Sequence, residues 1–186
     1  MAQSSTMTPL GTEAPPFSLP DVVTGRTVAL TDFSTSPALL VMFVCNHCPY
    51  VKHVEAELGR LGREYGGRGV GIVAISANDA AEYTDDAPAE LAKQAKRAGW
   101  TFPYLYDESQ SVAHAYDAVC TPDFFLFGPD RTLAYHGRLD ESRPKSNVPV
   151  TGRELRAALD AVLARRPAPA DQQASIGCGI KWKPDR

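Results

Sequence analysis

The sequence of 186 residues contains no long hydrophobic run and no cluster of basic side chains. Its longest apolar stretch, residues 38–45, is far shorter than the roughly 20 residues that a membrane-spanning helix needs, and it favours a buried strand. The 19 Lys and Arg residues are outnumbered by 22 Asp and Glu residues and are dispersed along the chain. We therefore expect neither membrane insertion nor nucleic-acid binding.

The first residues also lack the basic and apolar segments of a secretory signal peptide. We therefore expect a cytoplasmic protein in a reducing compartment. Only four cysteines are present, and in such a compartment cysteines serve catalysis or metal binding more often than structural disulfides. An apolar fraction of 44% is sufficient for a hydrophobic core without metals or disulfides.

The pattern of apolar residues divides the chain into an arm, one domain and a tail. Residues 1–13 are expected to form a flexible N-terminal arm. Residues 14–164 are expected to form the domain, because a chain of this length suits one domain with extensions. Residues 165–186 begin with a Pro-rich break and are expected to form a C-terminal tail, which contains Cys178.

Within the domain, the pattern predicts a hairpin with a turn near Gly25, then alternating strands and helices, then paired strands and a closing helix. A capping box from Thr151 to Glu154 is expected to open that last helix, and the acidic run 82–90 is interpreted as a solvated loop. This order predicts an α/β fold with a mixed sheet and helices on both faces. The expected strands are 38–44, 70–76, 104–107, 124–127 and 133–137, and the expected helices are 49–65, 89–99, 112–116 and 151–163.

The strongest chemical signal is the pair Cys45 and Cys48, which stands between a predicted buried strand and a predicted helix. Two thiols at this spacing can form a disulfide, and the unpaired N–H groups and dipole of a helix N-terminus stabilise a thiolate. We interpret Cys45 as the nucleophile toward a disulfide and Cys48 as the resolving thiol. The alternatives are two inert buried cysteines, or a zinc site that adds His47 but has no second ligand pair at knuckle-like spacing.

Two neighbours of the cysteines are expected to tune them. His47 can lend positive charge or a hydrogen bond to the thiolate, which would stabilise the reduced form and make the disulfide a stronger oxidant. Pro49 has no N–H, and this absence costs nothing in the first turn of a helix. Dithiol–disulfide chemistry requires no organic cofactor and no metal.

These features resemble the thioredoxin superfamily, and among its members the peroxiredoxin-like (AhpC/TSA-like) redoxins that carry a Cys-x-x-Cys. The resemblance covers residues 14–164 and rests on segments 14–20, 44–52 and 119–127, together with the tail segment 175–183. It implies a thioredoxin-like fold, in which helices flank a central mixed β-sheet with an N-terminal β-hairpin and a C-terminal tail. It also implies that Thr121–Pro122 is the superfamily's cis-proline position, where the backbone of Thr121 pairs with an extended substrate.

Other positions depart from the patterns of the superfamily. Counted from Cys45, the Thr/Ser and Pro positions of a peroxidatic site are occupied by Met42 and Ala38, which argues against peroxide reduction. Leu39 stands where thioredoxin has a buried acid, so a base for Cys48 must come from elsewhere. We therefore predict a thiol–disulfide oxidoreductase. The alternatives are an antioxidant thiol peroxidase of the peroxiredoxin type and a non-catalytic module that binds a partner or a metal.

The two remaining cysteines each have two interpretations. Cys120, which by the resemblance lies near the Cys45 sulfur, is either a third redox thiol or a small buried residue. Cys178 is either a resolving thiol that reaches the site from the tail, or a free surface thiol in a segment that Trp182 anchors. The expected partners of the protein are protein or small-molecule disulfides and a cellular thiol reductant.

Overall fold

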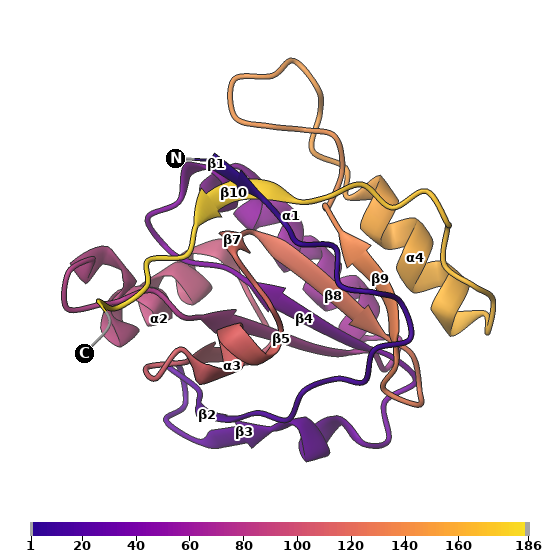
Figure 1. Ribbon diagram of the computed structural model, residues 1–186, viewed down its shortest axis with the longest axis horizontal. Coiled ribbons are helices and arrows are strands. Elements are labelled where there is room, and N and C mark those ends of the chain that lie inside the picture. The colour runs from indigo at the N-terminus through magenta and orange to yellow at the C-terminus, as the bar shows by residue number, and fades with distance from the viewer. Residues whose placement is uncertain (1, 185–186) are drawn as a thin grey trace.

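The central sheet has the strand order β6–β5–β4–β8–β9 in the computed structural model, which describes residues 2–184. β4 pairs in parallel with β5, and β5 pairs in parallel with β6, whereas β8 runs antiparallel to both β4 and β9. The predicted mixed sheet is therefore confirmed (Figure 1). Its strands are β4 (Leu39–Phe43), β5 (Gly71–Ser76), β6 (Tyr104–Tyr106), β8 (Asp123–Phe127) and β9 (Leu133–Gly137).

Alternate residues of β4 face two separate hydrophobic cores, because successive side chains of a strand point to opposite faces. Leu40 and Met42 pack on the face that α1, α2 and α4 cover. Leu39, Val41 and Phe43 pack on the other face, against α3 and the β2–β3 hairpin. The elements that cover the sheet are β2 (Ser18–Pro20), β3 (Thr27–Ala29), α1 (Pro49–Gly66), α2 (Pro88–Ala98), α3 (Ser111–Ala115) and α4 (Arg153–Leu163), with the short 3₁₀ helices η1 (Leu30–Phe33) and η2 (Thr84–Asp86).

The helix α1 follows the central strand directly and matches its sequence pattern. It begins at Pro49 and ends at Gly66, as predicted from the proline at its start and the two glycines at its end. The residues predicted to form its apolar stripe are all buried against the sheet. They are Val51, Val54, Leu58, Leu61 and Tyr65. This packing fixes the start of α1, and therefore the cysteines that precede it.

The start of α4 differs from the sequence prediction. The predicted capping box is wrong, because the N-cap residue is Gly152 in the left-handed region, at φ 67°. The N–H groups of Thr151 and Gly152 donate instead to the carboxylate of Asp140, at 2.7 and 2.6 Å. Glu154, which the capping box would need, forms an ion pair with Arg138 at 2.8 Å. A distant carboxylate thus replaces the local cap.

Both ends of the chain join a second, small sheet. β10 (Ile176–Gly179) lies between β1 (Ala2–Ser4) and β7 (Cys120–Thr121), and it runs antiparallel to both. Figure 1 shows the yellow C-terminal strand beside the indigo N-terminal strand. The sequence predicts a flexible arm over residues 1–13, whereas here residues 2–4 are paired and the backbone of Thr12 accepts a hydrogen bond from Leu133 at 2.8 Å.

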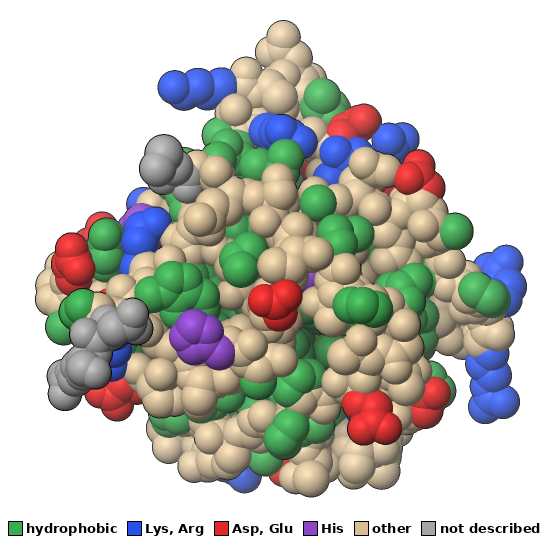
Figure 2. Space-filling model, in the orientation of Figure 1, with side chains coloured by type: hydrophobic (Ala, Val, Ile, Leu, Met, Phe, Trp, Pro, Cys, Tyr) green, Lys and Arg blue, Asp and Glu red, His purple; other side chains and the backbone are tan. Residues whose placement is uncertain are grey.

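The described part of the chain, residues 2–184, contains no helix with the length and apolar character that crossing a membrane requires. On the face shown in Figure 2, charged side chains of both signs lie mainly around the margin. Tan and green surface dominates its centre, where Figure 1 shows β1 and β10 and the segments that follow and precede them.

Candidate active site

Cys45 and Cys48 lie between β4 and α1, as the sequence predicts. β4 ends at Phe43 and α1 begins at Pro49, so both thiols belong to the connecting segment. Both are free cysteines with 0% of their surface exposed. The N-cap residue of α1 is Cys48, whereas the sequence analysis placed the sulfur of Cys45 at the helix N-terminus. α1 begins at Pro49, as predicted, so the residue directly before it is the second cysteine and not the first.

Thr121 contacts both sulfurs. The Sγ atom of Cys45 lies 3.4 Å from its Oγ1 atom. The Sγ atom of Cys48 lies 3.3 Å from its carbonyl oxygen. The peptide bond between Thr121 and Pro122 is cis, which confirms what the resemblance implied. The segment that the sequence analysis named as a substrate platform is therefore brought directly against the cysteine pair.

The surroundings of the two thiols shift their pKa values in opposite directions. A hydrogen bond from the Cys45 thiol is the main influence that lowers the pKa of Cys48, to about 5, although burial raises it. The backbone N–H of Val51, in the first turn of α1, also lowers it. The pKa of Cys45 is raised by its hydrogen bond to Cys48, by burial and by the negative charge of Asp86. These shifts favour the thiolate on Cys48, whereas the sequence analysis named Cys45 as the nucleophile.

Asp86 of η2 organises the loop between the cysteines. Its carboxylate is buried and accepts hydrogen bonds from the N–H groups of Asn46 and His47, at 2.7 and 3.1 Å. It also binds the side chain of Asn78 at 2.8 Å and the Nδ1 atom of His47, whose ring stacks on Tyr83. Burial would raise the pKa of Asp86, but the hydrogen bonds from His47 and Asn78 lower it overall. His47 thus engages a carboxylate, and its tuning of the thiolate stays a prediction.

Cys45, His47 and Asp86 also form a possible metal-ligand group within residues 2–184, since their ligand atoms lie within 4.8 Å of one another. The carboxylate of Asp86 already accepts four hydrogen bonds within the loop and from Asn78. A structural zinc site needs four ligands, and this group supplies three. The donor set therefore fits a hydrogen-bonded loop better than a zinc ion.

Two buried residues that the sequence analysis missed hold the backbone of Cys45. The side chain of Gln94, on α2, donates to the carbonyl oxygen of Cys45 at 3.1 Å. The hydroxyl of Tyr104, on β6, donates to Gln94 at 2.9 Å. Asp86 was missed as well, because its acidic segment resembles a solvated loop. A polar residue such as Gln94 on the apolar side of a predicted helix is the signal that could have identified a buried contact.

β10 brings Cys178 against the pair. Cys178 lies opposite Thr121 in the register, and its side chain and N–H both hydrogen-bond to Cys48 and help to lower the pKa of that thiol. Burial and then Cys48 raise the pKa of Cys178 to about 12. Cys120 lies opposite Gly179, is fully buried, and has a pKa raised by that burial. The structure thus joins Cys178 to the site and places Cys120 in the core.

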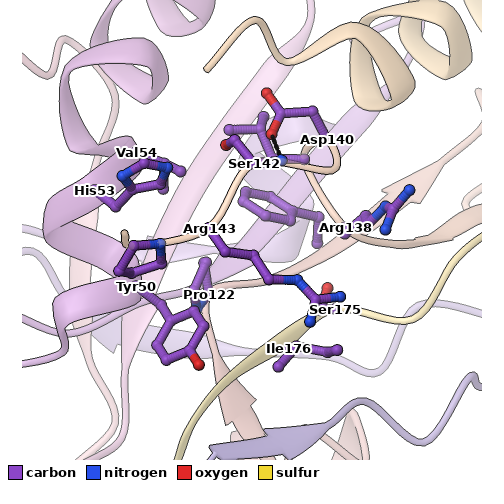
Figure 3. Close-up of a pocket in the computed structure, with 13 residues that line it drawn as sticks. Tyr50, His53, Val54, Pro122, Arg138, Asp140, Ser142, Arg143, Ser175 and Ile176 are labelled. Atoms are coloured by element: carbon purple, nitrogen blue, oxygen red, sulfur yellow. Dashed lines mark hydrogen bonds between the residues drawn. The ribbon is translucent and has the colours of Figure 1, made fainter. Parts of the chain in front are cut away.

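A pocket lies beside the cysteine pair (Figure 3). Tyr50 and His53 of α1 form one wall, Pro122 lines its interior, and Ile176 of β10 forms the opposite wall. Pro122 follows the residue that contacts both sulfurs, and Tyr50 is the second residue after Cys48. Two of its lining residues are therefore close in sequence to the cysteine pair or to the residue that contacts it, although neither cysteine lines the pocket.

A short loop supplies the charged part of this pocket. Arg138 is neutralised by its ion pair with Glu154, at 2.8 Å. Arg143 is exposed, and Figure 3 shows its side chain extending toward Ser175 and Ile176. Arg143 therefore gives the pocket a positive charge near the base of β10.

A family model matches residues 10–136, which is more than half of the chain, and its description is AhpC/TSA family. The chain belongs to the AhpC/TSA family. This membership confirms the resemblance to the AhpC/TSA-like redoxins of the thioredoxin superfamily, and it assigns the chain a redox function in broad terms.

Solved structures extend the comparison over the whole chain. An uncharacterized conserved protein from Geobacillus kaustophilus is 53% identical, with a TM-score of 0.98, and the match covers 100% of this chain and 98% of that one. A hypothetical protein from Sinorhizobium meliloti 1021 is 45% identical, with a TM-score of 0.96 and complete coverage of both chains.

A thiol:disulfide interchange protein from Chlorobium tepidum is 16% identical, with a TM-score of 0.64, and the match covers 84% of this chain and 99% of that one. This likeness confirms the thioredoxin-like fold. A search of curated proteins found no match.

The hydroxyl group near the Cys45 sulfur does not come from the position that a peroxidatic site would use. Met42, at the peroxidatic Thr/Ser position, is an apolar residue of β4, and its side chain is buried on the face of the sheet that α1 covers. The hydroxyl group that lies 3.4 Å from the Cys45 sulfur belongs instead to Thr121, on β7. The departure seen in the sequence is therefore also a departure in structure.

Proposed function

We propose that this AhpC/TSA protein is a thiol–disulfide oxidoreductase that performs dithiol–disulfide exchange through Cys45 and Cys48. The observation that carries the proposal is that both cysteine sulfurs lie against Thr121 at the start of α1, 3.4 Å from its Oγ1 atom and 3.3 Å from its carbonyl oxygen. In this setting the pKa of Cys48 is lowered to about 5. A thiol with this pKa is a thiolate near neutral pH, and the thiolate is the form that attacks a disulfide. Its partner Cys45 lies close enough to complete the exchange.

The exchange proceeds in two balanced steps. The Cys48 thiolate attacks one sulfur of a substrate disulfide, the substrate S–S bond breaks, and the departing thiolate takes up a proton. Cys45 then loses its proton and attacks the Cys48 sulfur of the mixed disulfide. A Cys45–Cys48 bond forms, the second substrate thiol leaves with a proton, and two electrons have passed to the substrate. A cellular thiol reductant reverses these steps on the protein.

The substrates in this proposal are protein or small-molecule disulfides. The edge of β7 at Thr121 suits an extended peptide, because main-chain hydrogen bonds recognise such segments independently of sequence. The pocket between α1 and β10 would receive a neighbouring group of the substrate, and Arg143 favours one with negative charge.

A redox titration tests the proposal. The purified protein is equilibrated in graded glutathione buffers, free thiols are trapped by alkylation, and the modified cysteines are located by peptide mass spectrometry. We expect Cys45 and Cys48 to oxidise together as a two-electron couple at roughly −200 to −270 mV. Cys120→Ala is the matched control and should leave this couple unchanged. A pair that stays reduced in the most oxidising buffer would overturn the proposal.

Peroxide reduction is the second candidate function, and membership of the AhpC/TSA family supports it. The thiolate would attack one peroxide oxygen and become a sulfenic acid, the O–O bond would break and the other oxygen would leave as water. The partner thiol would then form the disulfide and release a second water. Consumption of hydrogen peroxide by the reduced protein, followed with and without Cys48→Ala, measures this activity. A rate no faster than that of free glutathione would exclude it as the principal activity.

A further inference from the structure

The tail of the chain occupies the strand edge that the proposed function assigns to a substrate. β10 pairs with β7, and its register sets Cys178 opposite Thr121 and Gly179 opposite Cys120. An extended peptide that added to this edge would lie where β10 lies. A cysteine of the protein itself therefore stands at the position of a substrate cysteine.

Cys178 is the residue of β10 that reaches the cysteine pair. It lies opposite Thr121 in the register, and the sulfur of Cys48 lies 3.3 Å from the carbonyl oxygen of that same Thr121. The side chain of Cys178 packs against the hydrophobic cluster that contains Cys45 and Cys48. A thiol can attack a disulfide sulfur only if it can approach that sulfur, and Cys178 already contacts Cys48.

The position of Cys178 is held from both ends of β10. Before the strand, the N–H of Ser5 donates to the carbonyl oxygen of Ser175 at 2.9 Å. After the strand, the indole of Trp182 stacks on the ring of His114, with 4.2 Å between the ring centroids. These contacts keep the thiol at the pair, so no large movement of the tail is needed for reaction.

We propose that Cys178 is a third redox thiol, which takes over the disulfide from the Cys45–Cys48 pair. Cys178 loses its proton and attacks the Cys48 sulfur of the Cys45–Cys48 disulfide. A Cys48–Cys178 bond forms, the Cys45–Cys48 bond breaks, and Cys45 leaves as a thiolate that takes up a proton. One disulfide and one thiol are present before and after, so no further oxidant is needed. The inference rests on the proposed function, which supplies the first disulfide.

The order of the two events follows from charge. In the reduced protein, burial and Cys48 hold the proton on Cys178. When Cys48 enters a disulfide it carries no charge, while the positive charge of Lys181 continues to favour the Cys178 thiolate. Oxidation of Cys48 therefore removes one of the two influences that hold the proton on Cys178, which favours its attack after the first disulfide has formed. The resulting Cys48–Cys178 bond joins β10 covalently to the start of α1 and closes the substrate edge.

Disulfide mapping with oxidised glutathione tests the inference on wild type, Cys45→Ala, Cys178→Ala and the control Cys120→Ala. A Cys48–Cys178 bond joins the tryptic peptides that end at Lys52 and Lys181, whereas a Cys45–Cys48 bond lies within one peptide. We expect the wild type and Cys120→Ala to show both bonds. In Cys45→Ala, Cys178 should displace glutathione from Cys48, so that the Cys48–Cys178 bond accumulates. Cys178→Ala should retain only the Cys45–Cys48 bond.

The possible failures are distinguishable. If Cys45→Ala keeps glutathione on Cys48 and forms no bond to Cys178, the inference is wrong, while a Cys45–Cys48 bond in Cys178→Ala still supports the proposed function. If Cys178→Ala forms no disulfide at all, the proposed function is wrong and the inference fails with it. Circular dichroism spectra and thermal unfolding midpoints equal to those of the wild type establish that each variant is folded.

Discussion

Cys178 lies directly opposite Thr121 in the antiparallel pairing of β10 with β7. Thr121 is also the residue that contacts both thiols of the Cys45–Cys48 pair. The C-terminal strand is therefore part of the candidate active site, and it covers the strand edge beside thiols that have no exposed surface. A substrate can reach Cys48 only when β10 moves away from β7 or when the substrate is small.

The first prediction concerns this cover. Gly177 packs so closely that a Cβ atom there would overlap the carbonyl group of Thr121. Because backbone atoms cannot yield as a flexible side chain can, we expect Gly177→Ala to move β10 away from β7. Overpacking of this kind costs about 1–3 kcal/mol, so alkylation of Cys48 by iodoacetamide should become about tenfold faster or more. Peptide mass spectrometry over a time course measures the rate.

Gly179→Ala is the matched control on the same strand. A Cβ atom at Gly179 would meet the end of the Gln3 side chain, which can rotate aside. We therefore expect alkylation of Cys48 at nearly the wild-type rate. Equal acceleration in both variants, or none in Gly177→Ala, would show that β10 does not shield the thiol in solution.

The second prediction concerns which cysteine carries the negative charge. A thiol is deprotonated above its pKa, and the pKa of Cys48 is lowered to about 5 whereas that of Cys45 is raised. An ultraviolet absorbance titration should therefore show one thiolate that forms as the pH rises through about 5. Cys48→Ala should remove this transition. Cys45→Ala should keep it but move it to higher pH, because the largest cause of the lowered pKa is lost.

The opposite pattern would restore the assignment made from the sequence. If Cys45→Ala removes the transition near pH 5 and Cys48→Ala retains it, Cys45 is the thiolate and the N-cap position of Cys48 does not decide reactivity. Cys120→Ala, whose thiol has a pKa raised by burial, should leave the transition where it is in the wild type.

The third prediction concerns the loop between the cysteines. Asp86→Ala would leave the half-buried N–H groups of Asn46 and His47 without their buried acceptor. Unsatisfied buried donors cost about 1–3 kcal/mol each, so we expect the free energy of unfolding to fall by roughly 2–3 kcal/mol in urea denaturation. Asp85→Ala is the control, because Asp85 is exposed and accepts from Asn46 only through its backbone. It should change the free energy by less than about 0.5 kcal/mol.

The sequence predicted those parts of the molecule that local patterns encode. The apolar stripe of α1, its start at Pro49, and the position of Cys45 and Cys48 between strand and helix all follow from residues close together in the chain. The continuous apolar run of β4 likewise indicated a strand covered on both faces. The cis bond at Pro122 was predicted through the family resemblance and not through a physical pattern.

The remaining features depend on residues that are distant in sequence. β1 has three exposed residues and no apolar alternation, so its pairing with β10 leaves no periodic signal. Gln94 is 49 residues from Cys45, and only the packing of α2 brings them together. Cys48 is the N-cap because the helix begins at Pro49, as predicted, but the sequence pattern did not show which neighbours the two sulfurs would have. Tertiary contacts from Asp86 and Cys178 thus add to the local Cys45–Cys48 interaction in setting the two pKa values.

The last prediction concerns substrate charge. Arg143 lines the pocket beside the thiols and Lys145 stands on the same loop without lining it, while both side chains are exposed. Two unit charges a few ångström apart in water interact by about 1 kcal/mol, which corresponds to about fivefold in rate. Arg143→Glu should therefore slow oxidation of the pair by anionic oxidised glutathione by about threefold to fivefold and speed oxidation by cationic cystamine.

Lys145→Glu makes the same charge change at a greater distance and should alter both rates much less. The effect of Arg143→Glu should also shrink as salt is added, because charges in 0.1 M salt are screened over about 10 Å. Equal effects of the two variants would mean that only the net charge of the loop matters and that the pocket does not receive the substrate.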